Sequence, residues 1–201
     1  NTNYILLGMI AEEVTQETFQ SLITNRILKP LKMNHSWYQP NKIPPKLNHL
    51  VAHGYGADSD PKSPLYIFNN QDVTESSLSW ARETGSLWST PSDICRWVNG
   101  LFSETLLDNE QMTLLTAPHT TRHITLDGKS YQAGDLVTDI HPGTIYSSMG
   151  ILSFMSVQKP YYGHVFFFSG QMIGYTSVWM YYPQWQVCIT ISGNLSDSVL
   201  N

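Results

Sequence analysis

The side chains whose types and spacing most directly suggest chemistry are two pairs of histidines. His49 with His53, and His119 with His123, are four residues apart, a spacing that on a helix could place two imidazoles around one metal ion. Proline and glycine flank the first pair, and the second lies in a Pro-Thr-Thr stretch without a nearby carboxylate motif. We therefore interpret all four as surface histidines, and we expect no metal and no cofactor.

Other local signatures of catalysis are missing from the sequence, which contains no Gly-x-Ser-x-Gly, no phosphate-binding loop and no Cys-x-x-Cys. The two cysteines, Cys95 in a helical pattern and Cys188 in a strand pattern, could form a disulfide. We favour the alternative that they are two small buried hydrophobic side chains.

Two helices are predicted near the N-terminus. Asn1 or Thr2 can cap the first, whose apolar residues Leu6, Met9, Ile10 and Val14 fall on one face. Thr15 can cap the second, which ends before Lys29-Pro30 and has these apolar residues on its buried side: Phe19, Leu22, Ile23 and Ile27.

Two further helices follow a Pro- and Gly-rich stretch of loops and short elements. One begins at Thr90-Pro91-Ser92-Asp93, with Thr90 as cap, and its buried stripe consists of Ile94, Trp97, Val98 and Leu101. The other begins at Asp108, where Gln111 can complete a capping box, and turns Met112, Leu114 and Leu115 inward.

The last third of the chain changes to the period of β-strands. Asp127-Gly128 indicates a hairpin, and strands are predicted over 145–154, 163–168, 175–182 and 185–192, the last two joined through Pro183-Gln184. We expect an α+β fold: one partial domain over 1–201, mainly helix and loop over 1–140, with antiparallel strands over 141–201.

Three stretches also carry a known pattern of motifs: Asn1 to Gly8 with Ile27 to Met33, then Gly85 to Asp93, then Phe168 to Tyr175. They resemble the serine β-lactamase and penicillin-binding-protein superfamily, closest to its branch of class C β-lactamases and D-alanyl-D-alanine carboxypeptidases. The resemblance spans nearly the whole chain. It implies a β-lactamase/transpeptidase-like fold that is incomplete at the N-terminus, with unpaired backbone on one sheet edge and bare apolar surface.

The resemblance also implies a catalytic pocket. Asn1 takes the place of the Asn in a Tyr-x-Asn motif, and Ser169-Gly170-Gln171 matches the strand that faces the nucleophile. Ser169 would offer its hydroxyl to the substrate, Gly170 would let the substrate approach the backbone, and the N–H of Gln171 would be an oxyanion-hole donor. Phe168 and Tyr175 are the expected substrate-binding residues.

The sequence departs from the family pattern at the chemistry itself. The family acylates a serine in Ser-x-x-Lys, but the match at Ser59-Asp60-Pro61-Lys62 lies in a loop where proline prevents a helix interior. The same pattern also occurs at Ser156-Val157-Gln158-Lys159. Phe168 stands where the family has Lys or His, and a phenyl ring supplies neither charge nor a proton. His164 lies four residues back on the same strand face, about 13 Å away, too far to substitute.

The composition of the chain limits the classes of partner that we expect it to bind. Charged residues make up 13% of the 201, against about 25% in typical domains, which fits an exported protein, periplasmic or secreted. A net charge of −5 with 11 scattered Lys and Arg residues excludes a nucleic-acid surface. No apolar run approaches the roughly 20 residues of a membrane span. An incomplete sheet would seek the missing N-terminal segment or a second copy as its partner.

From these observations we expect the C-terminal part of a β-lactamase-like serine hydrolase, with the nucleophile and general base outside this chain. Its substrate would be a peptidoglycan-like peptide, a β-lactam, another D-amino-acid peptide or an ester, cleaved through an acyl-serine intermediate. The alternative is a non-catalytic pseudoenzyme, or ligand-binding module, on the same fold.

Overall fold

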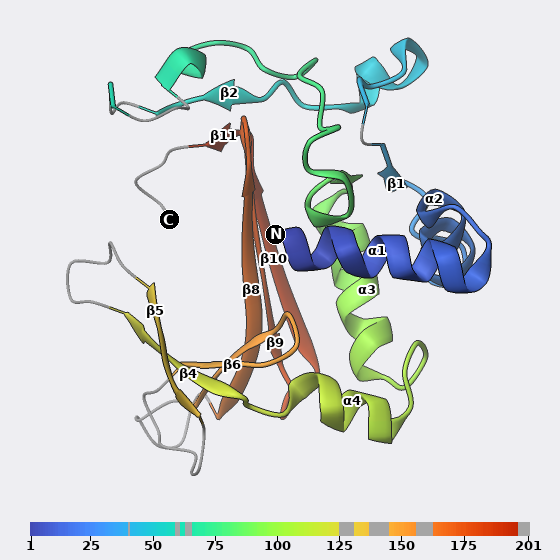
Figure 1. Ribbon diagram of the computed structural model, residues 1–201, viewed down its shortest axis with the longest axis vertical. Helices are drawn as coiled ribbons and strands as arrows, with labels where there is room; N and C mark the ends of the chain where they lie inside the picture. The colour runs from blue at the N-terminus through green and yellow to red at the C-terminus, as the bar shows by residue number, and fades with distance from the viewer. Residues whose placement is uncertain are drawn as a thin grey trace. The chain divides into compact units, whose positions relative to one another are not determined.

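The computed structural model describes residues 1–39, 41–58, 61–62, 66–124, 131–136, 145–155 and 163–196 (Figure 1). These residues form two compact units. The first comprises Asn1–Trp97, Gly170–Thr176 and the described residues 192–196, and the second comprises the described residues within Val98–Ser169 and Ser177–Ile191. Strands β8 (His164–Met172) and β9 (Tyr175–Tyr182) have residues in both units. Each unit is therefore described below by the contacts within it.

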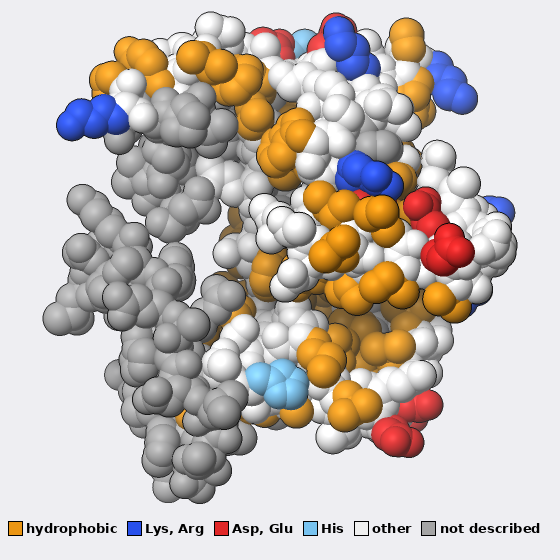
Figure 2. All heavy atoms as spheres, viewed as in Figure 1, with side chains coloured by type: hydrophobic (Ala, Val, Ile, Leu, Met, Phe, Trp, Pro, Cys, Tyr) orange, Lys and Arg blue, Asp and Glu red, His pale blue; other side chains and the backbone are white. Residues whose placement is uncertain are grey.

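Helix α1 (Thr2–Thr15) begins after Asn1, as predicted. Its predicted apolar face is exposed, with Leu6, Met9, Ile10 and Val14 between 50% and 77% accessible. Figure 2 shows hydrophobic side chains gathered over this helix. The buried residue of α1 is Gly8. The helix therefore contacts the rest of its unit along a narrow face, to which Gly8 contributes no side chain.

Helix α2 (Phe19–Ile23) continues directly into a π-helical turn, η1 (Thr24–Leu28). Its cap is Thr18, whose Oγ1 accepts a hydrogen bond of 3.2 Å from the N–H of Ser21, and the predicted cap Thr15 is wrong. Thr15 is the last residue of α1 and donates its hydroxyl to the carbonyl of Ala11. Because a π turn contains an extra residue, the buried stripe passes from Leu22 to Leu28 instead of Ile27.

Helices α3 (Pro91–Phe102) and α4 (Asn109–Thr116) begin where capping chemistry predicted. The N–H of Asp93 donates to Thr90 Oγ1 at 3.2 Å, and Asp108 with Gln111 forms the full capping box. Val98 and Leu101 are buried, but Leu114 is 57% exposed, so the inward orientation predicted for it is wrong.

The main sheet has seven strands in the order β10-β9-β8-β7-β6-β4-β5. The pairings from β4 to β8 are antiparallel, as predicted for this part of the chain. The strands are β4 (Thr120–Ile124), β5 (Tyr131–Leu136), β6 (Ile145–Ser147), β7 (Leu152–Met155), β8 (His164–Met172), β9 (Tyr175–Tyr182) and β10 (Val187–Gly193).

The sheet begins earlier in the chain than the sequence indicated. β4 and β5 pair with Ile124 opposite Tyr131, and the predicted Asp127-Gly128 turn lies outside the described residues. The single strand predicted over 145–154 is wrong, because it is divided into β6 and β7 by a turn. Gly150 takes a φ of 85° in that turn, a conformation that favours glycine.

Strand β10 is the last strand at one side of this sheet. Val187, Ile189 and Ile191 alternate along it and are 44%, 45% and 63% exposed. This strand therefore presents an exposed row of apolar side chains along its length.

The first unit also contains two small strand pairs. β1 (Trp37–Tyr38) pairs antiparallel with β3 (Leu87–Trp88), and β2 (Tyr55–Gly56) pairs in parallel with β11 (Leu195–Ser196). Three 3-10 turns occupy the loop-rich region: η2 (Pro45–Leu50), η3 (Tyr66–Phe68) and η4 (Arg82–Thr84).

Both cysteines lie in the described residues and are half-buried thiols, so the disulfide alternative is wrong. Among the helices that the structure describes, none combines the length and the apolar character needed to cross a membrane.

Candidate active site

Strand β8 changes from buried to exposed at the residues that the family resemblance predicts for the catalytic pocket. Val165 and Phe166 are buried, whereas Phe168, Ser169 and Gly170 are exposed. The strand therefore starts inside the second unit and then presents an open stretch of backbone with a hydroxyl and a glycine. Such a stretch is accessible to an extended ligand.

The buried part of β8 explains why His164 does not replace the cation that the family has at position 168. The His164 ring lies 4.4 Å from that of Phe166, which in turn packs at 5.1 Å on Phe102. Phe102 also stacks on Tyr181 at 4.3 Å. Burial lowers the pKa of His164, so its imidazole is a neutral member of an aromatic cluster at pH 7.

Phe168 is 37% exposed and carries no charge. This part of β8 thus lacks the cation that would recognise a carboxylate.

The turn between β8 and β9 is held tightly within the first unit. Gly174 has a φ of 84°, and its N–H donates to Ser196 Oγ at 2.7 Å. Tyr175 then donates its hydroxyl to the carbonyl of Ala52 at 2.8 Å, and its ring meets Trp88 edge-on at 5.4 Å. Tyr175 is half-buried, and burial raises its pKa. These contacts anchor the chain three to four residues beyond Gln171, and the substrate-binding role of Tyr175 stays a prediction.

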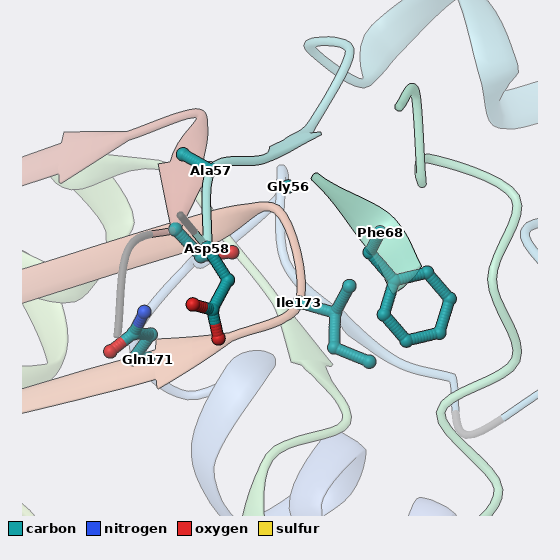
Figure 3. A pocket seen from close by; sticks show the side chains of 7 residues that line it. Gly56, Ala57, Asp58, Phe68, Gln171 and Ile173 are labelled. Carbon is teal, nitrogen blue, oxygen red and sulfur yellow. The ribbon is translucent and has the colours of Figure 1, made fainter. Parts of the chain in front are cut away.

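Gln171 points its side chain into a small cavity of about 10 Å³, room for roughly one water-sized group (Figure 3). Asp58 and Gln171 lie at one side of this cavity, and Phe68 and Ile173 lie at the other. Asp58 is only 3% exposed, which is unusual for a carboxylate. The predicted oxyanion residue therefore lines the same small cavity as a buried acid, while its backbone belongs to the strand.

Asn1 occupies the N-cap position of α1. Its carbonyl accepts hydrogen bonds from the N–H groups of Tyr4 and Ile5, but its side chain makes no capping bond. The amide of Asn1 is exposed and is not committed to the helix that it begins. It belongs to the first unit together with Gly170 and Gln171, whereas Phe168 and Ser169 belong to the second.

Neither histidine pair lies on an α-helix, the setting in which the four-residue spacing would bring two imidazoles together. Among the described residues, no group of three or more His, Cys, Asp or Glu side chains is placed to hold a metal ion. His53 instead pairs with Asp72 at 2.6 Å between Nδ1 and Oδ2. His119 donates its N–H to the carbonyl of Ser147, next to β4, and His123 is in that strand rather than in a helix.

Of the Ser-x-x-Lys match at 59–62, the described residues include Pro61 and Lys62, and the match at 156–159 lies outside the described residues. Sequence reasoning missed Asp58 and Glu83, both of which have buried carboxylates. Neither is signalled locally, because one follows a two-residue strand in Gly-rich text and the other lies in a short 3-10 turn.

Comparison with known proteins places this geometry in context. The chain matches the β-lactamase family over residues 1–199. Similar solved structures include a D-stereospecific amidohydrolase from Streptomyces sp., with a TM-score of 0.70 and 19% identity over 96% of this chain. The D-amino acid amidase of Ochrobactrum anthropi SV3 has a TM-score of 0.69 and 22% identity over 98% of this chain.

A penicillin-binding protein from Bacillus halodurans is similar as well, with a TM-score of 0.67 and 18% identity over 98% of this chain. The chain covers 49%, 50% and 51% of these three structures, so it spans about half their length. The likeness confirms the β-lactamase/transpeptidase-like fold. With its sequence match and its fold in agreement, the chain belongs to the β-lactamase family.

Proposed function

We propose that the whole protein hydrolyses amide bonds through an acyl-serine intermediate, with the nucleophile supplied from outside these 201 residues. The observation that carries the proposal is the exposed Ser169-Gly170 step of β8, followed by the anchored Gln171. An exposed glycine on a firmly held strand supports close approach of a substrate carbonyl to the backbone N–H of residue 171.

In the proposed reaction the serine oxygen attacks the amide carbon, and the resulting oxyanion accepts a hydrogen bond from the N–H of Gln171. The general base takes the serine hydroxyl proton as the C–O bond forms, and it delivers this proton to the leaving amine as the C–N bond breaks. Water hydrolyses the acyl-serine ester in a second step. Ser169 would hold the substrate through its hydroxyl, and the exposed amide of Asn1 would contact the substrate or the proton-transfer groups.

The substrate class that we favour is an amide of a D-amino acid. Two of the similar proteins are a D-stereospecific amidohydrolase and a D-amino acid amidase by name. Phe168 supports the same substrate class. A site without a cation at position 168 gains no charge interaction with a free carboxylate, the group that a carboxypeptidase substrate carries. As part of this proposal, the protein acts outside the cytoplasm, which fractionation of cells would test.

The test is intact mass of the protein in its full cellular length, before and after incubation with a fluorescent penicillin and a fluorophosphonate. Tryptic mapping then locates any adduct. An adduct on a serine outside residues 1–201 supports the proposal. An adduct on a serine within them, such as Ser169, contradicts it.

The second candidate is a ligand-binding protein that does not react, and Phe168 is the observation that favours it. The same experiment separates the two, because a folded protein without any adduct, but with measurable penicillin binding by calorimetry, is a binding module.

A further inference from the structure

A buried carboxylate supports α1 at its middle. The Glu83 side chain is 2% exposed and lies directly against Gly8. A Cβ added at Gly8 would fall 2.3 Å from Glu83 Cγ and 2.9 Å from its Cδ, far inside contact distance. Glycine inside a helix costs about 1 kcal/mol relative to alanine, so the close approach of Glu83 is the physical reason for glycine at this position.

An ion pair extends this contact by one helical turn. Arg82 Nη2 lies 3.0 Å from Glu83 Oε1 and 3.9 Å from Oε2 of Glu12, four residues after Gly8 on α1. Glu83 raises the pKa of Arg82, which therefore stays charged. The other oxygen of Glu12 accepts a hydrogen bond of 2.7 Å from the N–H of Phe19, which begins α2. The acids at positions 83 and 12 thus hold α1 at two successive turns.

The arrangement is costly in two respects. Arg82 takes a φ of 42°, in the left-handed region that non-glycine residues avoid. Within the described part of the chain, Glu83 Oε2 is buried and has no hydrogen-bond partner. A strained backbone beside an unsatisfied buried oxygen persists only where the surroundings hold it, and such sites are often tied to function.

We propose that Gly8, Arg82 and Glu83 form a positioning lock. This lock sets the rotation of α1 about its axis and its position along that axis, and thereby the location of Asn1. Asn1 lies seven residues before Gly8, about 10 Å along the helix axis. A helix transmits a displacement at Gly8 to its first residue because its hydrogen bonds resist bending. Glu83 contacts no reacting atom in this proposal, and its relevance to activity rests on the proposed hydrolase function.

The test uses Gly8→Ala in the full-length protein. The added methyl group and Glu83 compete for one space, so α1 shifts, and the rate of acylation by penicillin falls at least tenfold. The apparent dissociation constant of the probe changes less than threefold, because Asn1 is one of several contacts. Met9→Ala, on the exposed face of α1, is the control and leaves both values unchanged.

The double variant Gly8→Ala/Glu83→Ala distinguishes a lock from general damage. Shortening Glu83 makes room for the methyl group, so this variant recovers most of the acylation rate lost by Gly8→Ala alone. The lock is overturned if folded Gly8→Ala acylates at the normal rate, or if removing the Glu83 side chain brings no recovery.

A second readout does not need activity. Hydrogen exchange of the amides of residues 2–7 rises in Gly8→Ala and returns toward normal in the double variant if the lock is correct. If the wild-type protein forms no adduct, the proposed function fails, and exchange alone decides the lock. Normal exchange in Gly8→Ala then overturns it.

Discussion

The ring of Tyr175 rests on the backbone of Gly54, so close that a Cβ at position 54 would lie 2.4 Å from the ring atom Cζ. The Tyr175 hydroxyl reaches past this point to the carbonyl of Ala52. A residue at the start of β9 thus fastens the turn after Gln171 to the loop that precedes β2.

Replacing Gly54 by alanine should therefore destabilise the protein by about 1–3 kcal/mol, the usual cost of overpacking, because an aromatic ring held by a hydrogen bond cannot move aside. Urea denaturation monitored by tryptophan fluorescence would measure it. Gly85→Ala is the matched control, since its Cβ would meet the Met172 sulfur at 2.6 Å, and a thioether can rotate away. Equal losses for the two variants would contradict this account.

Asp72 should contribute a pH-dependent part of the stability. Its pKa is lowered from 3.8 to about 2, first by the hydroxyl and N–H of Thr74 and then by His53. A depressed pKa means that the contribution is complete above the unfolded value near 3.8 and is lost as the pH falls toward 2. Melting temperatures of wild type and Asp72→Asn should differ at pH 6 and converge near pH 2.

His53→Gln serves as the companion variant for that measurement. It should lower the melting temperature at pH 6 by less than Asp72→Asn does, because Thr74 is the larger influence on Asp72. A difference between wild type and Asp72→Asn that persists unchanged to pH 2 would refute the assignment.

Truncation of a leucine should destabilise the protein strongly in α3 at Leu101 and only slightly in α4 at Leu114. Leu101 is 5% exposed and Leu114 is 57% exposed. Leu101→Ala should cost roughly 2–5 kcal/mol in free energy of unfolding through lost burial and a cavity. Leu114→Ala should change it by less than about 0.5 kcal/mol, as for most surface substitutions. Chemical denaturation measures both, and a large loss at Leu114 would show that its side chain is covered.

Phe168 offers a test of charge at the candidate site. Phe168→Lys in the full-length protein should raise the rate of acylation by a penicillin, which carries a carboxylate, by about tenfold, since a charge-assisted hydrogen bond contributes roughly 1.5–3 kcal/mol. The residue is 37% exposed, so the substitution should not disturb folding. Phe168→Met, without charge, is the control. If the Lys and Met variants acylate equally, a cation at this position is not what limits recognition.

Local sequence chemistry was sufficient for several elements. The starts of α3 and α4 follow from a cap side chain that accepts a hydrogen bond from the backbone N–H three positions later, so they depend on residues close together in the chain. Period-two patterns likewise located β8, β9 and β10. The family could be recognised because its motifs are short runs of adjacent residues, such as Ser169-Gly170-Gln171.

Other features did not follow from cap preference and periodicity alone. Thr18, not Thr15, caps α2 because α1 extends to Thr15 and engages its hydroxyl. The apolar residues of α1 share a face, as their spacing predicts, yet periodicity alone does not say whether that face is covered.

For Asp93, the local sequence determines its position in the helix, whereas the tertiary structure determines its burial. Its place in the first turn of α3 is determined locally, since Thr90 caps that turn. Its complete burial is a tertiary result, because its carboxylate accepts hydrogen bonds from the His35 N–H at 2.8 Å and the Ser36 hydroxyl at 2.9 Å. Sequence by itself determined the starts of α3 and α4, the strands β8 to β10 and the family, through interactions within a few residues. Only the tertiary structure decided which acids are buried and which apolar faces are exposed, because burial depends on residues brought together from far along the chain.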